Sequence, residues 1–258
     1  MLDGSIPLAT AQSFGAVNRI DTGGTASYNG LVLSVQRRAA GVTVNGNYTW
    51  SHCISNWWNS EANSGDGTTS WQTANRSIER GNCIAGAADR RHIFNTSFVA
   101  ATPRFANPTL KVVASNWHMS TILRILSGDF MDINTRRDPM FSGVRFQRVD
   151  QVLPNVYGAK TVSDYLNPAA FRQPTNGLPG TIGRGSVRGP GTWQFDVALS
   201  RDFVLTERQK VEVRAEAFNV TNSMRMNDPD ASFESGTFGQ IRSARDPRIM
   251  QFALKYFF

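Results

Sequence analysis

Three histidines in the chain have a serine or an acidic residue close by in sequence, and these are the side-chain types of a hydrolytic site. They are His52, His92 and His118, with Ser51, Asp89 and Ser120. A Ser–His–acid hydrolase requires its groups to converge within hydrogen-bond reach, and many carry the serine in a GxSxG turn. The chain has no GxSxG motif, and its histidines fall on three different predicted strands. We therefore expect no enzymatic activity.

Two short acidic segments have the residue types of a calcium-binding loop. Ser64–Gly67 has the sequence SGDG, and Asn227–Asp230 has the sequence NDPD. Neither has the spacing of an EF-hand loop with its distal glutamate. Polar turns are the simpler interpretation, so we expect no metal site and no cofactor.

The two cysteines, Cys53 and Cys83, are separated by 29 intervening residues. Without a CxxC spacing they make a poor metal site. One disulfide that closes a loop suits an oxidising compartment, and two unrelated thiols are the alternative. We expect a Cys53–Cys83 disulfide that pins the two ends of a long loop.

Three tryptophans, Trp57, Trp58 and Trp71, lie in that same loop. Their rings could stack on an extracellular ligand such as a sugar. Aromatic side chains in loops also anchor the packing of the loop itself. The three tryptophans are therefore candidate ligand contacts, with loop packing as the alternative.

The basic residues do not form a nucleic-acid site. The net charge is +7, from 27 basic and 20 acidic residues. Nucleic-acid binding needs basic residues clustered on one element with aromatic stacking partners, whereas the pairs Arg37-Arg38, Arg90-Arg91 and Arg136-Arg137 are scattered at segment ends. Arginines at strand ends suit a lipid head-group region, because the stem lies along apolar surface while the charge stays in water.

The last segment, Arg248–Phe258, alternates in the manner of a strand with one apolar face. Large apolar side chains stand at every second position: Met250, Phe252, Leu254, Tyr256 and Phe258. The intervening positions are mixed and partly polar. Successive side chains of a strand point to opposite faces, so one face of this strand is continuously apolar. A terminal strand of this kind is typical of a bacterial outer-membrane barrel.

Seven further segments are predicted as strands, most of them by the same alternation, which transmembrane barrels use in place of long apolar runs. They are Gln12–Asp21, which is the weakest, Ser27–Arg38, Val42–Ile54, His92–Thr102, Trp117–Ser127, Trp193–Leu205 and Lys210–Val220. The mean hydropathy of −0.31 and the 40% of hydrophobic residues fit this arrangement. In Lys210–Val220 the second face is charged, as a wet lumen would require.

The predicted connections alternate in length along the chain. Ala39–Gly41, Pro103–Asn116 and Thr206–Gln209 are short, while Ser55–Arg90, Gly128–Pro190 and Thr221–Pro247 are long and irregular. With Phe258 on the periplasmic side, every short connection falls on that side and every long one outside. Short periplasmic turns with long extracellular loops are the expected asymmetry of these barrels.

Several segments together resemble the C-terminal barrel of Oar-like TonB-dependent receptors. They are SYNGLVLSVQRR and NYTWSH, then ADRRHIFNTSFV, then TWQFDVALSRDFVLTERQKVEVRAEAFNVTN, and finally FGQIRSARDPRIMQFALKYFF. The likeness runs from about residue 27 to the end and is strongest over the last 70 residues.

The resemblance implies a receptor in the cell outer membrane of a diderm bacterium, with a 22-stranded barrel, an internal plug, and energy from the TonB complex. The terminal motif implies that the barrel assembly machinery recognises Met250, Phe252, Leu254, Tyr256 and Phe258. No substrate site can be carried over from the family.

The chain departs from the family pattern at its N-terminal side. Residues 1–10 have no basic region and no apolar core, so they do not form a secretory signal. No plug, regulatory domain or TonB-contact segment is recognisable. We therefore expect residues 1–258 to be a C-terminal segment of one receptor barrel.

The predicted fold class is all-β: an antiparallel transmembrane β-barrel portion of about eight strands with long extracellular loops. The expected partners are outer-membrane lipid, the assembly machinery, the TonB complex through the missing N-terminal part, and an unknown extracellular ligand. Two rival functions stay open. One is a self-contained small outer-membrane pore or adhesin, and the other is a soluble secreted β-sandwich that binds carbohydrate.

Overall fold

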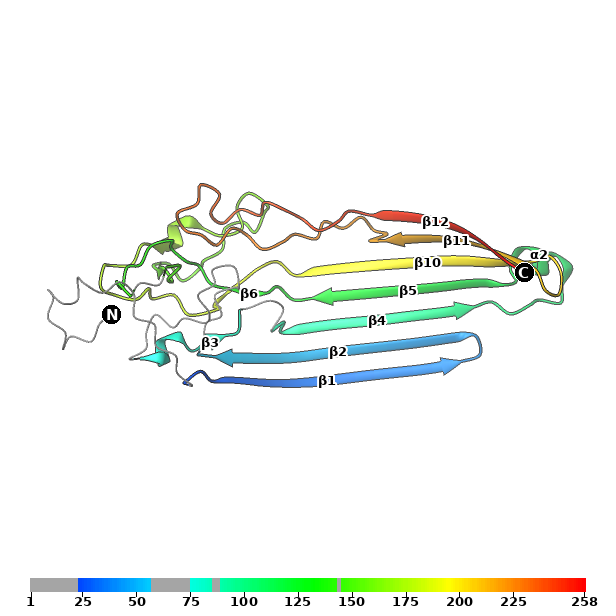
Figure 1. The fold of residues 1–258 in the computed structure, drawn as a ribbon, viewed down its shortest axis with the longest axis horizontal. Helices are drawn as coiled ribbons and strands as arrows, with labels where there is room; N and C mark the ends of the chain where they lie inside the picture. The colour runs from blue at the N-terminus through cyan, green and yellow to red at the C-terminus, as the bar shows by residue number, and fades with distance from the viewer. Residues whose placement is uncertain (1–22, 57–74, 85–88, 143–144) are drawn as a thin grey trace.

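The computed structural model describes residues 23–56, 75–84, 89–142 and 145–258. Its main feature is an eight-stranded antiparallel sheet in the order β1-β2-β4-β5-β10-β11-β12, with the two-residue strand β3 paired to β2 (Figure 1). The strands of this sheet are β1 Ala26–Ala39, β2 Val42–Ser55, β3 Gly81–Asn82, β4 His92–Ala101, β5 Trp117–Leu126, β10 Thr192–Val204, β11 Lys210–Phe218 and β12 Ile249–Phe257.

The long strands confirm the strand prediction from Ser27 onward, with boundaries that shift by one or two residues. The weakest predicted strand, Gln12–Asp21, lies outside the described residues. Neighbouring strands follow each other in sequence, so the path is a meander. The long strands form one sheet, not the two face-packed sheets of a β-sandwich.

The two ends of the sheet differ as predicted (Figure 1). At the end that we call the turn end, the strands are joined by residues 40–41, 102–116 and 205–209. At the opposite end, the loop end, the connections are residues 56–91, 127–191 and 219–248. Figure 1 shows the C-terminus at the turn end.

Local chemistry explains two of the short connections. Gly41 ends the two-residue turn between β1 and β2 with φ of 74°, a conformation that glycine adopts without steric cost. In the turn 205–209, the Thr206 side-chain oxygen accepts hydrogen bonds from the Arg208 and Gln209 amides. The third connection contains a six-residue helix, α2 Pro108–Val113.

The long connections at the loop end are more ordered than the sequence indicated. Within the segment predicted as irregular, Gly128–Pro190, the chain forms two pairs of very short strands and a 3-10 helix. These elements are β6 Phe130–Met131 with β9 Val187–Arg188, β7 Asp150–Gln151 with β8 Phe171–Arg172, and η2 Pro168–Ala170.

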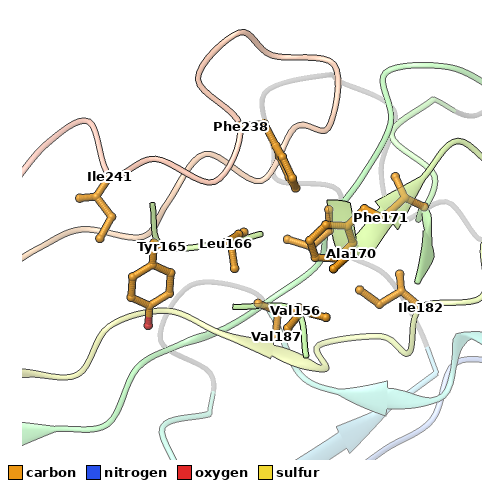
Figure 2. Close-up of a cluster of buried hydrophobic side chains, with 11 residues drawn as sticks. Val156, Tyr165, Leu166, Ala170, Phe171, Ile182, Val187, Phe238 and Ile241 are labelled. Atoms are coloured by element: carbon orange, nitrogen blue, oxygen red, sulfur yellow. The ribbon is translucent and has the colours of Figure 1, made fainter. Parts of the chain in front are cut away.

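The hydrophobic core of the described chain lies in this region and not against the sheet (Figure 2). We call residues 127–191 together with 219–248 the loop domain, because both segments supply the core. The core side chains are Ile133, Val149, Val156, Tyr165, Leu166, Ala170, Phe171, Ile182, Val187, Phe238 and Ile241. Phe238 packs edge-on against both Phe171 and Phe233, with ring centres 5.4 Å apart in each pair.

The main sheet is open in the described structure, with β1 and β12 as its edges. No helix in the described part of the chain is long and apolar enough to cross a bilayer.

Candidate functional site

The register of the sheet places most of the large apolar side chains of the long strands on one surface. In an antiparallel pair, residues directly opposite each other share a face. One row of opposite residues crosses the whole sheet: Phe252, Ala215, Leu199, Met119, Ala100, Val42 and Ala39. A parallel row consists of Met250, Ala217, Val197, Thr121, Phe98, Val44 and Arg37. We call this surface the apolar face.

Many of the large side chains of the apolar face are exposed. Phe252 is 73% exposed and Leu254 is 74% exposed, and strands β1, β2, β5, β10 and β11 also present large exposed apolar residues. A water-soluble surface rarely carries a contiguous apolar patch of this kind, and such patches mark protein or membrane contacts. A surface that runs over all the long strands fits a bilayer.

Aromatic side chains stand near both ends of the apolar face. Trp193, Phe94 and Tyr48 lie in one row near the loop end, and Trp117 and Phe203 lie near the turn end. The ten residue-to-residue steps from Trp193 to Phe203 span roughly 33 Å along the strand. At the tilt of about 40° that outer-membrane strands adopt, this gives an apolar band about 25 Å tall between aromatic girdles, which is the value for such barrels.

The opposite surface, which we call the polar face, carries a row of hydrogen-bonding residues. Gln194, Arg124, Asn95, Asn47 and Ser34 stand opposite one another across five strands. Ser34 donates to the Asn47 side-chain oxygen at 2.8 Å. This face therefore has the chemistry of a water-filled interior.

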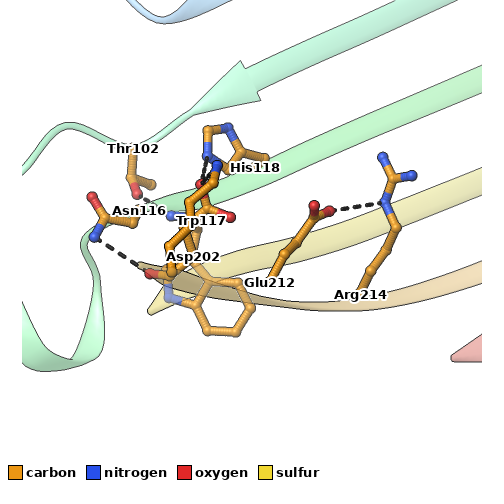
Figure 3. Close-up of polar contacts among 8 residues, drawn as sticks. Thr102, Asn116, Trp117, His118, Asp202, Glu212 and Arg214 are labelled. Carbon is orange, nitrogen blue, oxygen red and sulfur yellow. Dashed lines mark hydrogen bonds and ion pairs between the residues drawn. The ribbon is translucent and has the colours of Figure 1, made fainter. Parts of the chain in front are cut away.

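Charged residues continue the polar face at the turn end (Figure 3). Asp202 lies 3.2 Å from the Lys210 ammonium and 3.8 Å from the His118 ring. The Arg214 guanidinium bridges Glu212 at 3.5 Å and Glu216 at 3.3 Å. In Figure 3, Trp117 points away from the side of the sheet that carries His118, as the alternation of a strand requires.

The structure joins Cys53 and Cys83 by a disulfide, with Cα atoms 5.4 Å apart. Buried Asp89 lies beside it and accepts hydrogen bonds from the Cys53 amide at 2.9 Å and from the Ser51 hydroxyl at 3.3 Å. The neighbouring Arg90 forms an ion pair with Asp129. These contacts tie the base of the loop 56–91 to the ends of β2 and β5.

A second set of charged side chains connects the loop 56–91 to the loop domain. The Asp132 carboxylate accepts a hydrogen bond from the Gly185 amide at 2.6 Å. Burial raises the pKa of Asp132, although the nearby Arg148 guanidinium, the Gly185 amide and the Arg184 guanidinium act in the opposite direction. Arg184 donates to the Glu79 carbonyl at 3.3 Å, and Arg148 donates to the Ile78 carbonyl at 2.5 Å.

The histidines lie in three different environments. His52 is hydrogen bonded to Asn82 at 2.8 Å, and His92 to the Tyr48 hydroxyl at 2.8 Å near the loop end. His118 lies at the turn end beside Asp202. Of the candidate hydrolytic groups, the structure brings Ser51 and Asp89 together and places Ser120 in a different row of the polar face.

The remaining sequence candidates divide into described and undescribed residues. Met250, Phe252, Leu254 and Tyr256 lie on the apolar face of the edge strand β12, and Phe258 follows it with its ring stacked on Tyr256 at 6.0 Å. Trp57, Trp58, Trp71 and Ser64–Gly67 lie outside the described residues.

The segment Asn227–Asp230 has no regular secondary structure, and Asp230 accepts a hydrogen bond from the Thr237 hydroxyl at 2.8 Å. In the described part of the chain, no group of three or more His, Cys, Asp or Glu side chains could hold a metal ion.

Sequence reasoning missed the loop-domain core and the charges Asp132 and Arg184, and it named Asp89 only as a candidate hydrolytic group, not as a hydrogen-bond partner of Cys53. The core residues follow no period of 2 or 3.6, so periodicity could not find them. Asp89 and Arg90 offered one signal in the sequence, because charged residues directly before an alternating segment mark the start of the strand. Asp132 and Arg184 offered none, since they are ordinary loop residues until the fold brings them together.

A family model described as an outer membrane beta barrel domain matches residues 4–251, which is nearly the whole chain. The searches of curated proteins and of solved structures gave no match.

Proposed function

The chain belongs to the outer membrane beta barrel domain family and lies in the outer membrane, and from this premise we propose that it is part of the barrel of an Oar-like TonB-dependent receptor. In this proposal the complete protein takes up a ligand across the outer membrane with energy from the inner membrane. Its role is binding and transport without catalysis, and without a cofactor or nucleic acid.

The observation that carries the proposal is the open sheet with one apolar and one polar face. Strands β1 and β12 are long edges. The hydrocarbon core of a bilayer has no water to satisfy the backbone groups of such edges. We infer that further strands pair with β1 and β12 and complete a wide barrel, in which the polar face lines the interior.

The polar face supports this role because it offers a plug many polar contacts. The row that includes Asn47, Asn95 and Arg124 directly neighbours the aromatic row near the loop end, on the face that a plug inside the barrel would contact. A TonB-driven rearrangement of that plug then requires contacts that break and re-form in water. Side-chain amides suit this requirement, since they exchange protein and water partners at little net cost.

The loop domain supports extracellular ligand binding. Its own hydrophobic core and the Cys53–Cys83 disulfide hold the long connections in one arrangement. A preorganised loop surface loses less conformational entropy on binding than a disordered one. We place the ligand on the extracellular loops, with Trp57, Trp58 and Trp71 of the connection 56–91 as candidate contacts.

The proposed recognition by the assembly machinery rests on strand β12. Its apolar side chains, among them Phe252 and Leu254, are exposed, and one backbone edge is unpaired in the described structure. An unpaired edge is a template for strand pairing. Deletion of Phe258 should therefore reduce the amount of protein in the outer membrane, and unchanged insertion would contradict this role.

The transport proposal is tested by the reading frame upstream of residue 1. We expect a plug domain, a TonB-contact segment and a signal peptide in the same frame. If the complete reading frame encodes no plug, TonB-dependent uptake is contradicted, while outer-membrane location stands.

A gel experiment separates this proposal from a self-contained small barrel. The chain of 258 residues, expressed with a signal peptide, is compared on gels with and without heating. We expect a single unfolded band in both lanes. A fast-migrating band in the unheated lane would show a closed barrel and contradict the larger one.

A further inference from the structure

The helix α2 exposes its apolar side chains although it belongs to a short connection. Asn107 caps its first turn by accepting hydrogen bonds from the Thr109 and Leu110 amides. Within the helix, Val112 is 69% exposed and Val113 is 62% exposed. Adjacent exposed apolar side chains of this kind mark a contact with a protein or with a membrane.

Two residues of the apolar face hold the C-terminal end of α2. The Trp117 indole donates to the Val113 carbonyl at 2.8 Å, and the Arg201 guanidinium donates to the Val112 carbonyl. The same guanidinium lies over the rings of Trp117 at 5.2 Å and Phe203 at 4.8 Å. The contacts therefore run to the surface that faces lipid and not to the polar face, which carries His118.

We propose that α2 is an anchor in the membrane interface at the turn end. Leu110, Val112 and Val113 enter the boundary between head groups and acyl chains of the adjacent phospholipid leaflet. Short amphipathic elements lie in this plane with their apolar side chains about 5–10 Å deep. The apolar surface of α2 continues the lipid-facing surface of the sheet through Trp117.

Charge supports phospholipid as the occupant. Exposed Arg104 lies before the helix and exposed Lys111 lies within it. The phosphates of a phospholipid leaflet attract such basic side chains, while their aliphatic stems lie along the apolar surface. Asn107 supplies only a neutral amide at the start of the helix, so no negative charge opposes this contact.

The anchor fixes the depth of the barrel wall at the turn end. Trp117 and Arg201 stand opposite each other on β5 and β10, and both hold α2. A vertical shift of these strands would therefore pull α2 out of the interface or push Lys111 into hydrocarbon. This inference requires only the outer-membrane location, so it is independent of TonB-dependent transport.

Fluorescence quenching tests the anchor in isolated outer membranes that contain the protein expressed from its own gene. An environment-sensitive fluorescent amino acid replaces Val112 in one variant, Val113 in a second, and Glu207 in the control. Glu207 lies at the same end of the sheet in the exposed turn 205–209. Each sample is titrated with a doxyl-labelled fatty acid, which partitions into membranes, and with aqueous iodide.

We expect the doxyl label to quench residues 112 and 113 about threefold more strongly than residue 207, and iodide to show the reverse order. Iodide quenching at 112 and 113 equal to that at 207 would overturn the proposal. Protection of 112 and 113 from both quenchers would also overturn it, because a protein partner would then cover α2. In an Arg201→Gln variant the doxyl quenching at 112 should fall towards the control, and unchanged quenching would refute the tie through Arg201.

Discussion

Large apolar residues are exposed in the sheet and buried in the loop domain. In the sheet, Leu199, Phe252 and Leu254 are exposed, and opposite residues line up in rows that cross every long strand. In the loop domain, Ile133, Leu166 and their neighbours are buried against one another. The two regions belong to one chain of ordinary overall hydropathy. We infer that their apolar residues differ in exposure because the two regions have different surroundings.

The structure of the loop domain suits an aqueous environment, and the structure of the sheet suits a bilayer. Burial of apolar surface stabilises the loop domain because water is the alternative environment. The sheet instead satisfies its backbone groups between strands, which is the requirement that lipid imposes, and its apolar side chains meet acyl chains. Variants that affect one region and spare the other test this contrast.

The largest effect is expected in the loop-domain core. Leu166 is 1% exposed, so Leu166→Ala leaves a cavity and should destabilise the loop domain by about 2–5 kcal/mol. Leu178, which is 58% exposed in the same domain, provides the matched control in Leu178→Ala. Hydrogen exchange of residues 127–191 measures the effect. Equal exchange in the two variants would contradict a hydrophobic core that stabilises the loop domain in water.

The next effect is expected on the apolar face. Leu199 lies near the middle of the apolar band, so Leu199→Arg should cost about 2–4 kcal/mol in the membrane. Its neighbour Ala198 lies on the polar face opposite Glu216, and Ala198→Arg should cost much less. The yield of each variant in the outer-membrane fraction reports the difference. A greater loss for Ala198→Arg would reverse the assignment of the faces.

A smaller effect is expected at the base of the loop 56–91. Replacing both Cys53 and Cys83 with Ser removes a cross-link from the unfolded chain and should cost about 2 kcal/mol. We expect the low end of the usual range because Asp89 and Arg90 still hold the same base. Protease cleavage within residues 56–82 should increase while that of the sheet stays constant. Faster cleavage of the sheet would contradict the expectation that the disulfide stabilises the loop 56–91 and not the sheet.

The smallest effect concerns pH and the loop domain. Burial opposes the ionisation of Glu234, but hydrogen bonds from the Arg136 amide, Thr135 and Arg137 and the Arg137 charge outweigh it and lower its pKa. A lowered pKa contributes stability that is present above the unfolded value of about 4.3 and is lost as the pH falls through the folded value. Proteolysis of the loop domain by pepsin should therefore accelerate below about pH 4. In Glu234→Gln this pH dependence should weaken, and an unchanged pH profile would contradict the role of Glu234.

Sequence alternation was sufficient to predict the sheet because side-chain direction in a strand has a period of two. Within the predicted strands Ser27–Arg38 and Trp193–Leu205, the alternating apolar residues lie on the apolar face of the sheet, as Leu31 and Trp193 show. The unequal connections at the two ends were also predicted, and the family match supports the outer-membrane location. Closure of the barrel stays a prediction, since the described sheet is open.

The loop domain could not be predicted in the same way. Val149 and Ile182 come together through chain reversals, and their amide and carbonyl groups form a hydrogen bond across a long separation in sequence. Phe238 completes the core from the connection between β11 and β12. Such contacts depend on the positions at which the strands of the sheet begin and end. Alternation within one segment carries no information about those positions.

The most direct test of the central claim is an accessibility scan along β10. Single cysteines at residues 195–202 of the membrane-embedded protein are titrated with a water-soluble thiol reagent and with a lipid-soluble one. We predict a period of two, in which Phe195, Val197 and Leu199 react from the lipid and Asp196, Ala198 and Ser200 react from water. Uniform reactivity with the water-soluble reagent at all eight positions would contradict a lipid-facing sheet.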